Sequence, residues 1–203
     1  MAFMSRRSFL VASGLTVGAG MVLPRTVFGA NERIRVGVIG TGDRGSSLMK
    51  DIARLRESHD VEITAVCDVW RPNREAAAAR VEKIFGKKPF QTSRFGELLA
   101  RDDTDAVVIA TPDFAHTPIM IEALKAGRDV YCEKPMSQTV EEANEALDLA
   151  RTRERVVQVG TQRRSEGRWK AARAFVATGA LGHISRISAA NCFNHPRWAR
   201  DCS

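Results

Sequence analysis

The sequence predicts an α/β fold with a doubly wound parallel sheet, followed by the start of a second, α+β domain with an open sheet. After residue 30, short apolar runs alternate with amphipathic helical patterns, as in a parallel sheet with helices on both faces. The chain has 203 residues, of which 44% are hydrophobic and 27% charged, as in an ordinary globular protein. These values exclude a disordered tail, a collagen-like fibre and a disulfide-dense small protein.

The predicted strands are short apolar runs, and the predicted helices lie between them. Strands are expected at 33–39, 61–67, 105–110, 128–132 and 156–160, and helices at 44–57, 72–85, 95–101, 114–126, 139–153 and 166–178. Pro72 near a helix start and Gly86 at a helix end support these bounds. Thr139, three residues before Glu142, predicts a capping box. A final run, 184–191, alternates apolar and polar residues, which predicts a strand with one solvent-exposed face.

The first thirty residues are expected to be an export signal and not part of the fold. The run Ser5-Arg6-Arg7-Ser8-Phe9-Leu10 resembles a twin-arginine signal, and a weakly apolar stretch, Val11–Leu23, follows it. That stretch is shorter than the roughly 20 residues needed to span a bilayer. We therefore expect a periplasmic protein cleaved after Ala30, with an uncleaved anchor as the alternative, and no stable membrane span in the mature chain.

The net charge of +7 does not predict nucleic-acid binding. Residues 1–30 contribute +3 of it, and beyond them acidic and basic residues are mixed, with few aromatic residues between them. The four cysteines show no spacing typical of zinc, so we expect no metal. Cys67 and Cys132 fall at the ends of predicted buried strands, where small thiols are common. A disulfide between Cys192 and Cys202 stays open, because an exported protein meets an oxidising compartment.

A glycine-rich motif connects the first predicted strand to the first predicted helix. It reads Gly40-Thr41-Gly42-Asp43-Arg44-Gly45 and matches the Gly-x-Gly-x-x-Gly fingerprint of dinucleotide-binding Rossmann folds. Gly40 permits a tight turn, Gly42 lets the main chain approach a pyrophosphate, and Gly45 lets helix and strand pack closely. Free N–H groups at the helix start would face the phosphates. The alternative is a glycine-rich turn without a ligand.

An acidic residue follows the second predicted strand, where such folds bind the ribose of the cofactor. Asp68 lies 23 residues after Gly45, and its carboxylate can accept hydrogen bonds from a ribose diol, which favours NAD. Asp68 would repel a 2′-phosphate, but Arg71 and Arg74 follow it and leave NADP open. The alternative for both arginines is the solvated start of a helix.

Two further loops follow predicted parallel strands, at the edge of the sheet where ligands bind in such folds. The first runs from Thr111-Pro112 to His116, and His116 either faces a ligand or lies in the first turn of a helix. The second is Glu133-Lys134-Pro135. A lysine at this place either acts on a substrate oxygen, as a positive charge or an acid, or is an ordinary exposed turn residue. A cis peptide bond before Pro135 would re-aim Lys134.

Together these motifs resemble the glucose–fructose oxidoreductase/inositol dehydrogenase/MocA (Gfo/Idh/MocA) family of oxidoreductases. The resemblance is carried by the glycine motif, by Thr111-Pro112 to His116 and, most specifically, by Glu133-Lys134-Pro135, in that order and spacing. The twin-arginine run and Val159-Gly160-Thr161-Gln162-Arg163-Arg164 resemble the exported bacterial branch of the family. The resemblance covers about residues 31–190.

The resemblance implies an NAD(P)-dependent oxidoreductase that acts on a sugar, cyclitol or related polyol. Lys134 would be the catalytic residue, lying beside the nicotinamide and polarising or protonating the substrate oxygen during hydride transfer. Glu133 would orient its loop. The other residues that the resemblance assigns to the cofactor site, beside the glycine motif and Asp68, are Thr111, Pro112, His116, Glu133, Lys134 and Gln162.

The resemblance also implies three parts in the chain. These are a signal peptide at 1–30, an NAD(P)-binding Rossmann domain at 31–160, and the truncated start of a substrate and oligomerisation domain at 161–203. In the family, that second domain supplies most substrate contacts, the subunit interface and usually an acid/base histidine. His183 and His195 match no such pattern, so a homo-oligomer is expected only where the rest of the domain is supplied.

Two other functions stay open at this point. A dinucleotide-binding fragment without catalysis, or a subunit that needs a partner, would keep the glycine motif and lack a complete substrate pocket. A methyltransferase-like Rossmann domain is disfavoured, because it has no need of Glu133-Lys134-Pro135 after its fourth strand.

Overall fold

The computed structural model of the chain describes residues 33–189. They form two compact units that divide after Val159, and each unit is described by itself. The expected signal peptide at 1–30 and the residues from 190 onward, with Cys192, His195 and Cys202, lie outside the described residues. None of the described helices is both long and apolar enough to cross a membrane.

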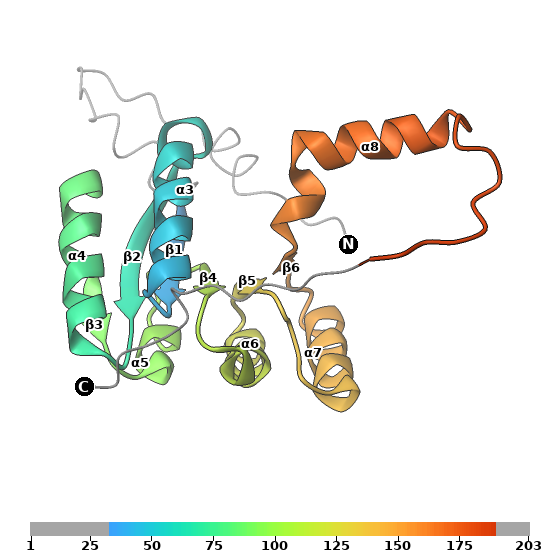
Figure 1. Ribbon diagram of the computed structural model, residues 1–203. Helices are drawn as coiled ribbons and strands as arrows, with labels where there is room; N and C mark the ends of the chain where they lie inside the picture. Colours follow the sequence, from blue (N-terminus) through green and yellow to red (C-terminus); the bar gives the residue numbers. More distant parts are fainter. Residues whose placement is uncertain (1–32, 190–203) are drawn as a thin grey trace, which may run out of the picture. The chain divides into compact units, whose positions relative to one another are not determined.

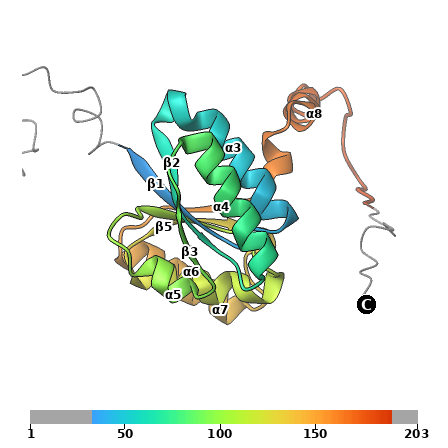
Figure 2. The same cartoon turned by 90° about the vertical axis from the view of Figure 1, so that its left-hand side faces the viewer.

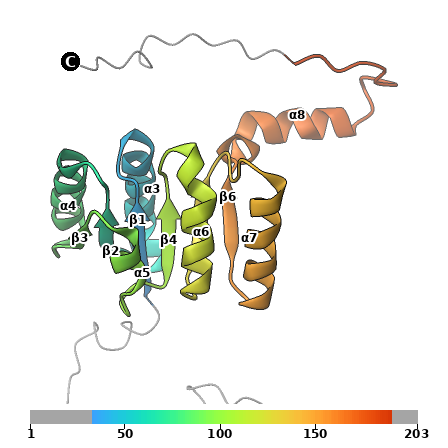
Figure 3. The ribbon, with the colours of Figure 1, turned by 90° about the horizontal axis from the view of Figure 1, so that it is seen from below.

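The first unit is built on one sheet with the strand order of a Rossmann fold (Figure 3). Its strands are β1 (Ile34–Ile39), β2 (Val61–Cys67), β3 (Phe90–Thr92), β4 (Ala106–Ile109), β5 (Asp129–Glu133) and β6 (Val157–Gly160). They stand in the order β3-β2-β1-β4-β5-β6, and the four pairs among β1 to β5 are all parallel. The chain order reverses between β1 and β4, and that reversal is where such folds bind ligands. The predicted doubly wound parallel sheet is therefore confirmed.

Helices cover both faces of the sheet, as Figures 1 and 2 show. On one face lie α3 (Asp43–His59) and α4 (Arg71–Phe85), and on the other lie α5 (Phe95–Leu99), α6 (His116–Lys125) and α7 (Val140–Thr152). A short 3₁₀ helix, η1 (Asp113–Ala115), precedes α6. The glycines at the ends of α4 and α6, Gly86 and Gly127, have positive φ values of 71° and 72°, which glycine adopts without the cost of a Cβ.

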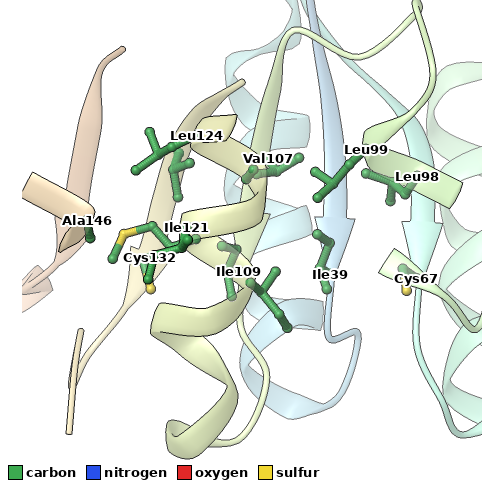
Figure 4. Packing of buried hydrophobic residues seen from close by; sticks show 14 of the residues in the cluster. Ile39, Cys67, Leu98, Leu99, Val107, Ile109, Ile121, Leu124, Cys132 and Ala146 are labelled. Carbon is green, nitrogen blue, oxygen red and sulfur yellow. The ribbon is translucent and has the colours of Figure 1, made fainter. Parts of the chain in front are cut away.

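Each face of the sheet has its own hydrophobic core, because successive strand residues point to opposite faces. Val38 and Val66 pack with Leu48 and Met49 of α3 on one face. The larger core on the other face joins strand residues to α5, α6 and α7 (Figure 4). Its labelled members include Ile39, Cys67, Ile109 and Cys132 from strands and Leu98, Leu99, Leu124 and Ala146 from helices. Burial on both faces explains why the strands read as continuous apolar runs.

Two local expectations differ from the structure in this unit. β3 was not predicted, since three residues are too few to show a period. The capping box at Thr139 forms only in part. The Oγ1 atom of Thr139 accepts a hydrogen bond from Glu142 N at 3.2 Å, but the Glu142 carboxylate lies 3.4 Å from the Ser137 hydroxyl instead of returning to the Thr139 amide. That amide donates to the Ser137 hydroxyl oxygen at 3.2 Å, which satisfies it locally.

The second unit contains a 3₁₀ helix, η2 (Gln162–Ser165), and α8 (Gly167–Ala177), which confirms the helix predicted at 166–178. The strand predicted at 184–191 is wrong over residues 184–189, which are exposed and carry no regular secondary structure. A strand needs a neighbour to pair its N–H and C=O groups, and no described segment pairs with these residues.

Candidate cofactor-binding site

The glycine motif forms the turn between β1 and α3, and two of its glycines are required by the fold. Gly40 has φ +84°, and a Cβ there would lie 2.6 Å from the carbonyl carbon of Ala110. A Cβ on Gly45 would lie 1.9 Å from the carbonyl oxygen of Gly40. Gly40 therefore permits close contact with the loop after β4, and Gly45 permits α3 to approach β1.

Gly42 lies in a less crowded environment, where a Cβ would fit without a clash. Its φ of −63° suits any residue, and a Cβ there would meet only Asn73 Nδ2, at 3.6 Å. Glycine at this position is therefore not required by packing within the protein. A group outside the chain that comes close to the main chain, such as a pyrophosphate, explains it.

The start of α3 leaves main-chain N–H groups for such an anion. Gly42 is the N-cap residue, and no side chain caps the helix. Ser46 N makes the first main-chain hydrogen bond of the helix, to Gly42 O at 2.7 Å. The N–H groups of Asp43, Arg44 and Gly45 precede that bond, and the positive end of the helix dipole lies at the same place. The site thus fits a dinucleotide phosphate.

Asp68 lies beside the glycine motif, directly after β2. Its Oδ2 atom accepts hydrogen bonds from Thr41 N at 2.8 Å and from Thr41 Oγ1 at 3.0 Å. Its Oδ1 atom accepts one from Trp70 N at 2.9 Å. Asp68 and buried Thr41 therefore hold each other at the place where a ribose diol binds in such folds.

The two arginines after Asp68 differ in their surroundings. Arg74 donates from Nη1 to the carbonyl oxygen of Asp68 at 2.8 Å. Arg71 is exposed, with only a loose contact to Glu75 at 3.9 Å. Arg71 therefore matches the solvated helix start that the sequence left open, whereas Arg74 is held against the main chain of Asp68.

Thr111 and Pro112 form the loop after β4, across from the glycine motif. Pro112 is exposed and is the N-cap residue of η1. The Oγ1 atom of Thr111 is buried and has no hydrogen-bond partner among the described residues. A buried hydroxyl without a partner costs free energy unless a ligand or water satisfies it. This orphaned group therefore also suits a cofactor site.

His116 is buried between the loops that follow β4 and β5. Its Nδ1 lies 2.7 Å from the carbonyl oxygen of Pro135, and its Nε2 lies 2.8 Å from that of Thr111. A ring that carries both protons donates to both oxygens, and a neutral ring donates to one. The neighbouring Thr117 hydroxyl donates to Met136 O at 2.8 Å. His116 is the first residue of α6 and is only 1% exposed, and its ring holds the two loops together, a contact that neither sequence-based alternative described.

Glu133 ends β5 and is 3% exposed, yet each of its carboxylate oxygens has a partner. Oε1 accepts from Arg44 Nε at 2.6 Å and from the Tyr131 hydroxyl at 3.4 Å. Oε2 accepts from Lys134 N at 3.1 Å. Burial alone would lower the pKa of the Arg44 guanidinium, but the hydrogen bond and charge of Glu133 outweigh it and raise the pKa. Burial and the charge of Glu133 also raise the pKa of Tyr131.

Lys134 is exposed at the carboxyl end of β5, and its side chain makes no hydrogen bond or ion pair with other residues of the described part. The peptide bond between Lys134 and Pro135 is cis, as the sequence-based expectation required. The Lys134 amine is therefore open to a ligand at the edge of the sheet. Gln162 begins η2 in the second unit and is exposed, whereas the other predicted site residues lie in the first unit.

Sequence reasoning missed two contributors to this site, Tyr131 and Thr117. Tyr131 is the single tyrosine of the chain, and it lies two residues before Glu133 in a predicted strand. Strand residues two apart share a face, so that spacing was the available signal. Thr117 carried no signal, because its partner is a main-chain carbonyl at Met136.

The described residues contain neither a reactive thiol nor a cluster that could bind a metal ion. Burial raises the pKa of both Cys67 and Cys132 to about 12, and the neighbouring Asp68 and Glu133 charges add to the respective shifts. Both thiols are therefore unreactive near neutral pH, as expected of small buried side chains. No cluster of histidine, cysteine or acidic side chains within residues 33–189 could hold a metal ion.

The strand order, the open glycine at a helix start and the acidic residue after β2 define a dinucleotide-binding Rossmann domain. The chain belongs to the Gfo/Idh/MocA family: residues 34–161 match the model of that oxidoreductase family with an NAD-binding Rossmann fold. Among solved structures, the WlbA dehydrogenase of Bordetella pertussis, in complex with NADH and UDP-GlcNAcA, matches with a TM-score of 0.65 and 27% identity. That match covers 75% of this chain and 45% of the other.

The curated relatives at similar sequence identity are named as glycosidases and not as dehydrogenases. A glycosyl hydrolase family 109 protein of Saccharopolyspora erythraea is 33% identical over 190 residues, which cover 86% of this chain and 40% of the relative. An alpha-N-acetylgalactosaminidase of Shewanella oneidensis is 32% identical over 171 residues, covering 71% of this chain and 36% of the relative. The chain thus spans about two fifths of the length of the curated relatives that it matches.

Proposed function

We propose that this chain binds NAD(H) at the start of α3 and belongs to an enzyme that transfers hydride between nicotinamide and a sugar, cyclitol or related polyol. The observation that carries the proposal is Gly42, where a Cβ would meet only Asn73 Nδ2 at 3.6 Å and which caps a helix start whose first N–H groups have no partner one turn earlier in the helix. Family membership supports the oxidoreductase class. The solved relative with a UDP-linked sugar acid supports a carbohydrate as the substrate.

The residues at the carboxyl edge of the sheet have distinct tasks in this proposal. When bound, the nicotinamide ring accepts or gives the hydride. In the reducing direction the exposed Lys134 ammonium would hold the substrate carbonyl oxygen by its charge and donate a proton to it. In the oxidising direction the neutral Lys134 amine would accept the proton of the alcohol. The buried Glu133 carboxylate fixes the Lys134 main chain through its amide. Thr111, with its unpartnered hydroxyl, supplies a hydrogen bond to the cofactor.

NAD is the preferred form of the cofactor in this proposal. The Asp68 carboxylate accepts hydrogen bonds and carries a negative charge at the ribose position, which suits a diol and repels a 2′-phosphate. Arg74 lies beside the Asp68 main chain and reduces that repulsion. A variant of the 3-ketoreductase KijD10 of Actinomadura kijaniata, 27% identical to this chain, binds NADP and TDP-benzene, so both forms occur among relatives.

A second candidate function is cleavage of an N-acetylgalactosaminide with NAD as a bound cofactor. The names of the curated relatives favour it, at 32% and 33% identity. In such a reaction the cofactor is regenerated within each turnover, so bond cleavage would proceed without a net change in the nicotinamide absorbance. Hydride transfer to a free polyol would instead accumulate reduced cofactor.

The test has two stages. The 203-residue chain is titrated with NADH and NADPH by calorimetry, with Gly42→Asp as the control variant, and we expect binding that the variant weakens sharply because it adds a carboxylate at the phosphate position. The protein is then supplied with NAD and either polyols and sugars or an aryl α-N-acetylgalactosaminide. Reduced nicotinamide supports hydride transfer as the net reaction, and aryl release without it supports the second candidate. Failure of folded wild-type chain to bind either dinucleotide contradicts both.

We also propose that residues 1–30 direct export by the twin-arginine route. The support is the run Ser5-Arg6-Arg7-Ser8-Phe9-Leu10 and the short apolar stretch after it. Replacing Arg6 and Arg7 by lysine is expected to stop export of a fused reporter. Unchanged export of that double variant would contradict the proposal.

A further inference from the structure

The guanidinium of Arg44 connects two loops that lie 89 residues apart in the sequence. Arg44 is in the first turn of α3, inside the glycine motif, and its side chain extends to Glu133 at the end of β5. Nε and Nη2 of Arg44 each lie 2.6 Å from the same carboxylate oxygen of Glu133. The Arg44 guanidinium therefore pairs with a carboxylate of the protein, although the main chain of Arg44 belongs to the motif expected to bind phosphate.

In the Arg44–Glu133 ion pair, the carboxylate is much more deeply buried than the guanidinium. The Glu133 side chain is 4% exposed, whereas that of Arg44 is 35% exposed. A buried carboxylate is stable only when it is paired and hydrogen-bonded, and among the described residues the only cation paired with Glu133 is Arg44. The other contact to the same oxygen is the Tyr131 hydroxyl, at 3.4 Å, which is a weak neutral donor. Arg44 thus fixes the position of the Glu133 side chain more than any other contact does.

Glu133 in turn restrains the main chain of Lys134. Its second oxygen accepts the hydrogen bond of Lys134 N at 3.1 Å, so the carboxylate plane sets the orientation of the Lys134 main chain. The Lys134 amine is exposed and makes no hydrogen bond or ion pair within the described residues. The side chain of Lys134 therefore adds no restraint of its own. The contacts therefore run from the first turn of α3 through Arg44 and Glu133 to the main chain of Lys134.

We propose that Arg44 is a positioning residue that links the dinucleotide-binding turn to the Lys134 loop through Glu133 and does not bind the phosphates itself. The inference rests on the proposed function for its catalytic consequence, while its structural part concerns contacts made without a cofactor. Because Arg44 acts through Glu133, its loss releases the Lys134 main chain and leaves the N–H groups of α3 in place. Hydride transfer is then impaired more than cofactor affinity.

The first test measures amide hydrogen exchange at Lys134 by NMR, on the cofactor-free chain. Arg44→Gln is expected to raise the exchange rate at Lys134 by about tenfold, since the acceptor of that amide becomes mobile. The matched control is Arg54→Gln, on the same helix. Its 78%-exposed side chain pairs, among residues 33–189, only with Asp51 at 2.9 Å, so this substitution should leave the rate unchanged. In a Glu133→Gln background, Arg44→Gln should add no further increase, because both substitutions break one connection.

The second test compares binding with turnover. Arg44→Gln is expected to change the Kd for NADH by less than about threefold while lowering kcat by about tenfold or more, and Arg44→Lys should restore part of kcat. An unchanged exchange rate at Lys134, or a loss of NADH affinity greater than about threefold, overturns the proposal, and the second result identifies Arg44 as a phosphate ligand. If Arg44→Gln does not fold, Arg44→Lys must itself raise exchange by at least about threefold for the proposal to stand.

These outcomes separate the inference from the proposed function. A wild-type chain that binds no dinucleotide contradicts the proposed function, and the exchange rates then decide the positioning role alone. A wild-type chain that binds NADH, with unchanged exchange in Arg44→Gln, leaves the proposed function intact and refutes the link through Glu133.

Discussion

Gly42 and Gly45 lie three residues apart in one motif, and the structure predicts opposite consequences for the same substitution to alanine. A Cβ at Gly42 meets only Asn73 Nδ2 at 3.6 Å, an ordinary van der Waals distance, and φ is −63°. A Cβ at Gly45 lies 1.9 Å from Gly40 O, which is about 1.5 Å closer than a normal contact and involves main chain that cannot rotate away. Gly42→Ala should therefore preserve the fold, and Gly45→Ala should damage it.

The magnitudes follow from these distances. For Gly42→Ala, a poorer N-cap residue and a less flexible unfolded chain nearly offset each other, so the free energy of unfolding should change by less than about 1 kcal/mol. For Gly45→Ala, overpacking between α3 and β1 should lower it by about 1–3 kcal/mol or more. The methyl group of Gly42→Ala would project into the space of the pyrophosphate, and we expect NADH affinity to fall by at least about tenfold, which is about 1.4 kcal/mol.

The assay combines chemical denaturation with NADH titration on the wild-type chain and both variants. The expected pattern is a stable Gly42→Ala variant with weak binding, beside a destabilised Gly45→Ala variant. A Gly42→Ala variant that binds NADH as tightly as the wild-type chain would refute the placement of the cofactor pyrophosphate beside Gly42. Equal loss of stability in the two variants would refute the packing argument.

Three further outcomes follow from the site. Lys134→Ala should lower hydride transfer by about 10²–10⁴-fold with NADH affinity retained, measured by steady-state kinetics, and an unchanged rate would remove Lys134 from the chemistry. Thr111→Val should leave the cofactor-free stability unchanged or raise it by up to about 1 kcal/mol, because the lost hydroxyl has no partner, while weakening NADH binding; lower cofactor-free stability would contradict this. The pKa of Cys67 and Cys132 rises from 9.0 to about 12 on folding, so unfolding releases protons and stability should fall as the pH rises through that interval; pH-dependent denaturation that is flat there would contradict their burial.

Much of the first unit could be predicted from the sequence because its central strands are buried on both faces. Runs such as Ala106–Ile109 are continuously apolar, and Gly86 and Gly127 end the helices with a backbone conformation that glycine favours. The strand predicted at 184–191 illustrates the limit of this reasoning. Its alternation describes a surface suited to pairing, but a strand forms only against a partner, which no described segment supplies.

The sequence predicted which residues lie at the strand ends, but it did not predict which groups those residues contact. Spacing alone placed the glycine motif, Asp68 and Lys134 at strand ends, where parallel sheets bind ligands. It did not indicate that the His116 ring reaches Pro135 O or that Arg44 reaches Glu133, because these contacts join residues 19 and 89 positions apart in the chain. Such contacts depend on the register between strands, which local patterns do not encode.

Dinucleotide binding is the central claim, and calorimetric titration of the folded 203-residue chain with NADH tests it most directly. We expect a single site that binds NADH in the wild-type chain, with an affinity that Gly42→Asp lowers sharply, and NADPH bound less tightly because of the Asp68 charge. Absence of heat from NADH and NADPH alike, with a folded protein in the cell, would contradict it.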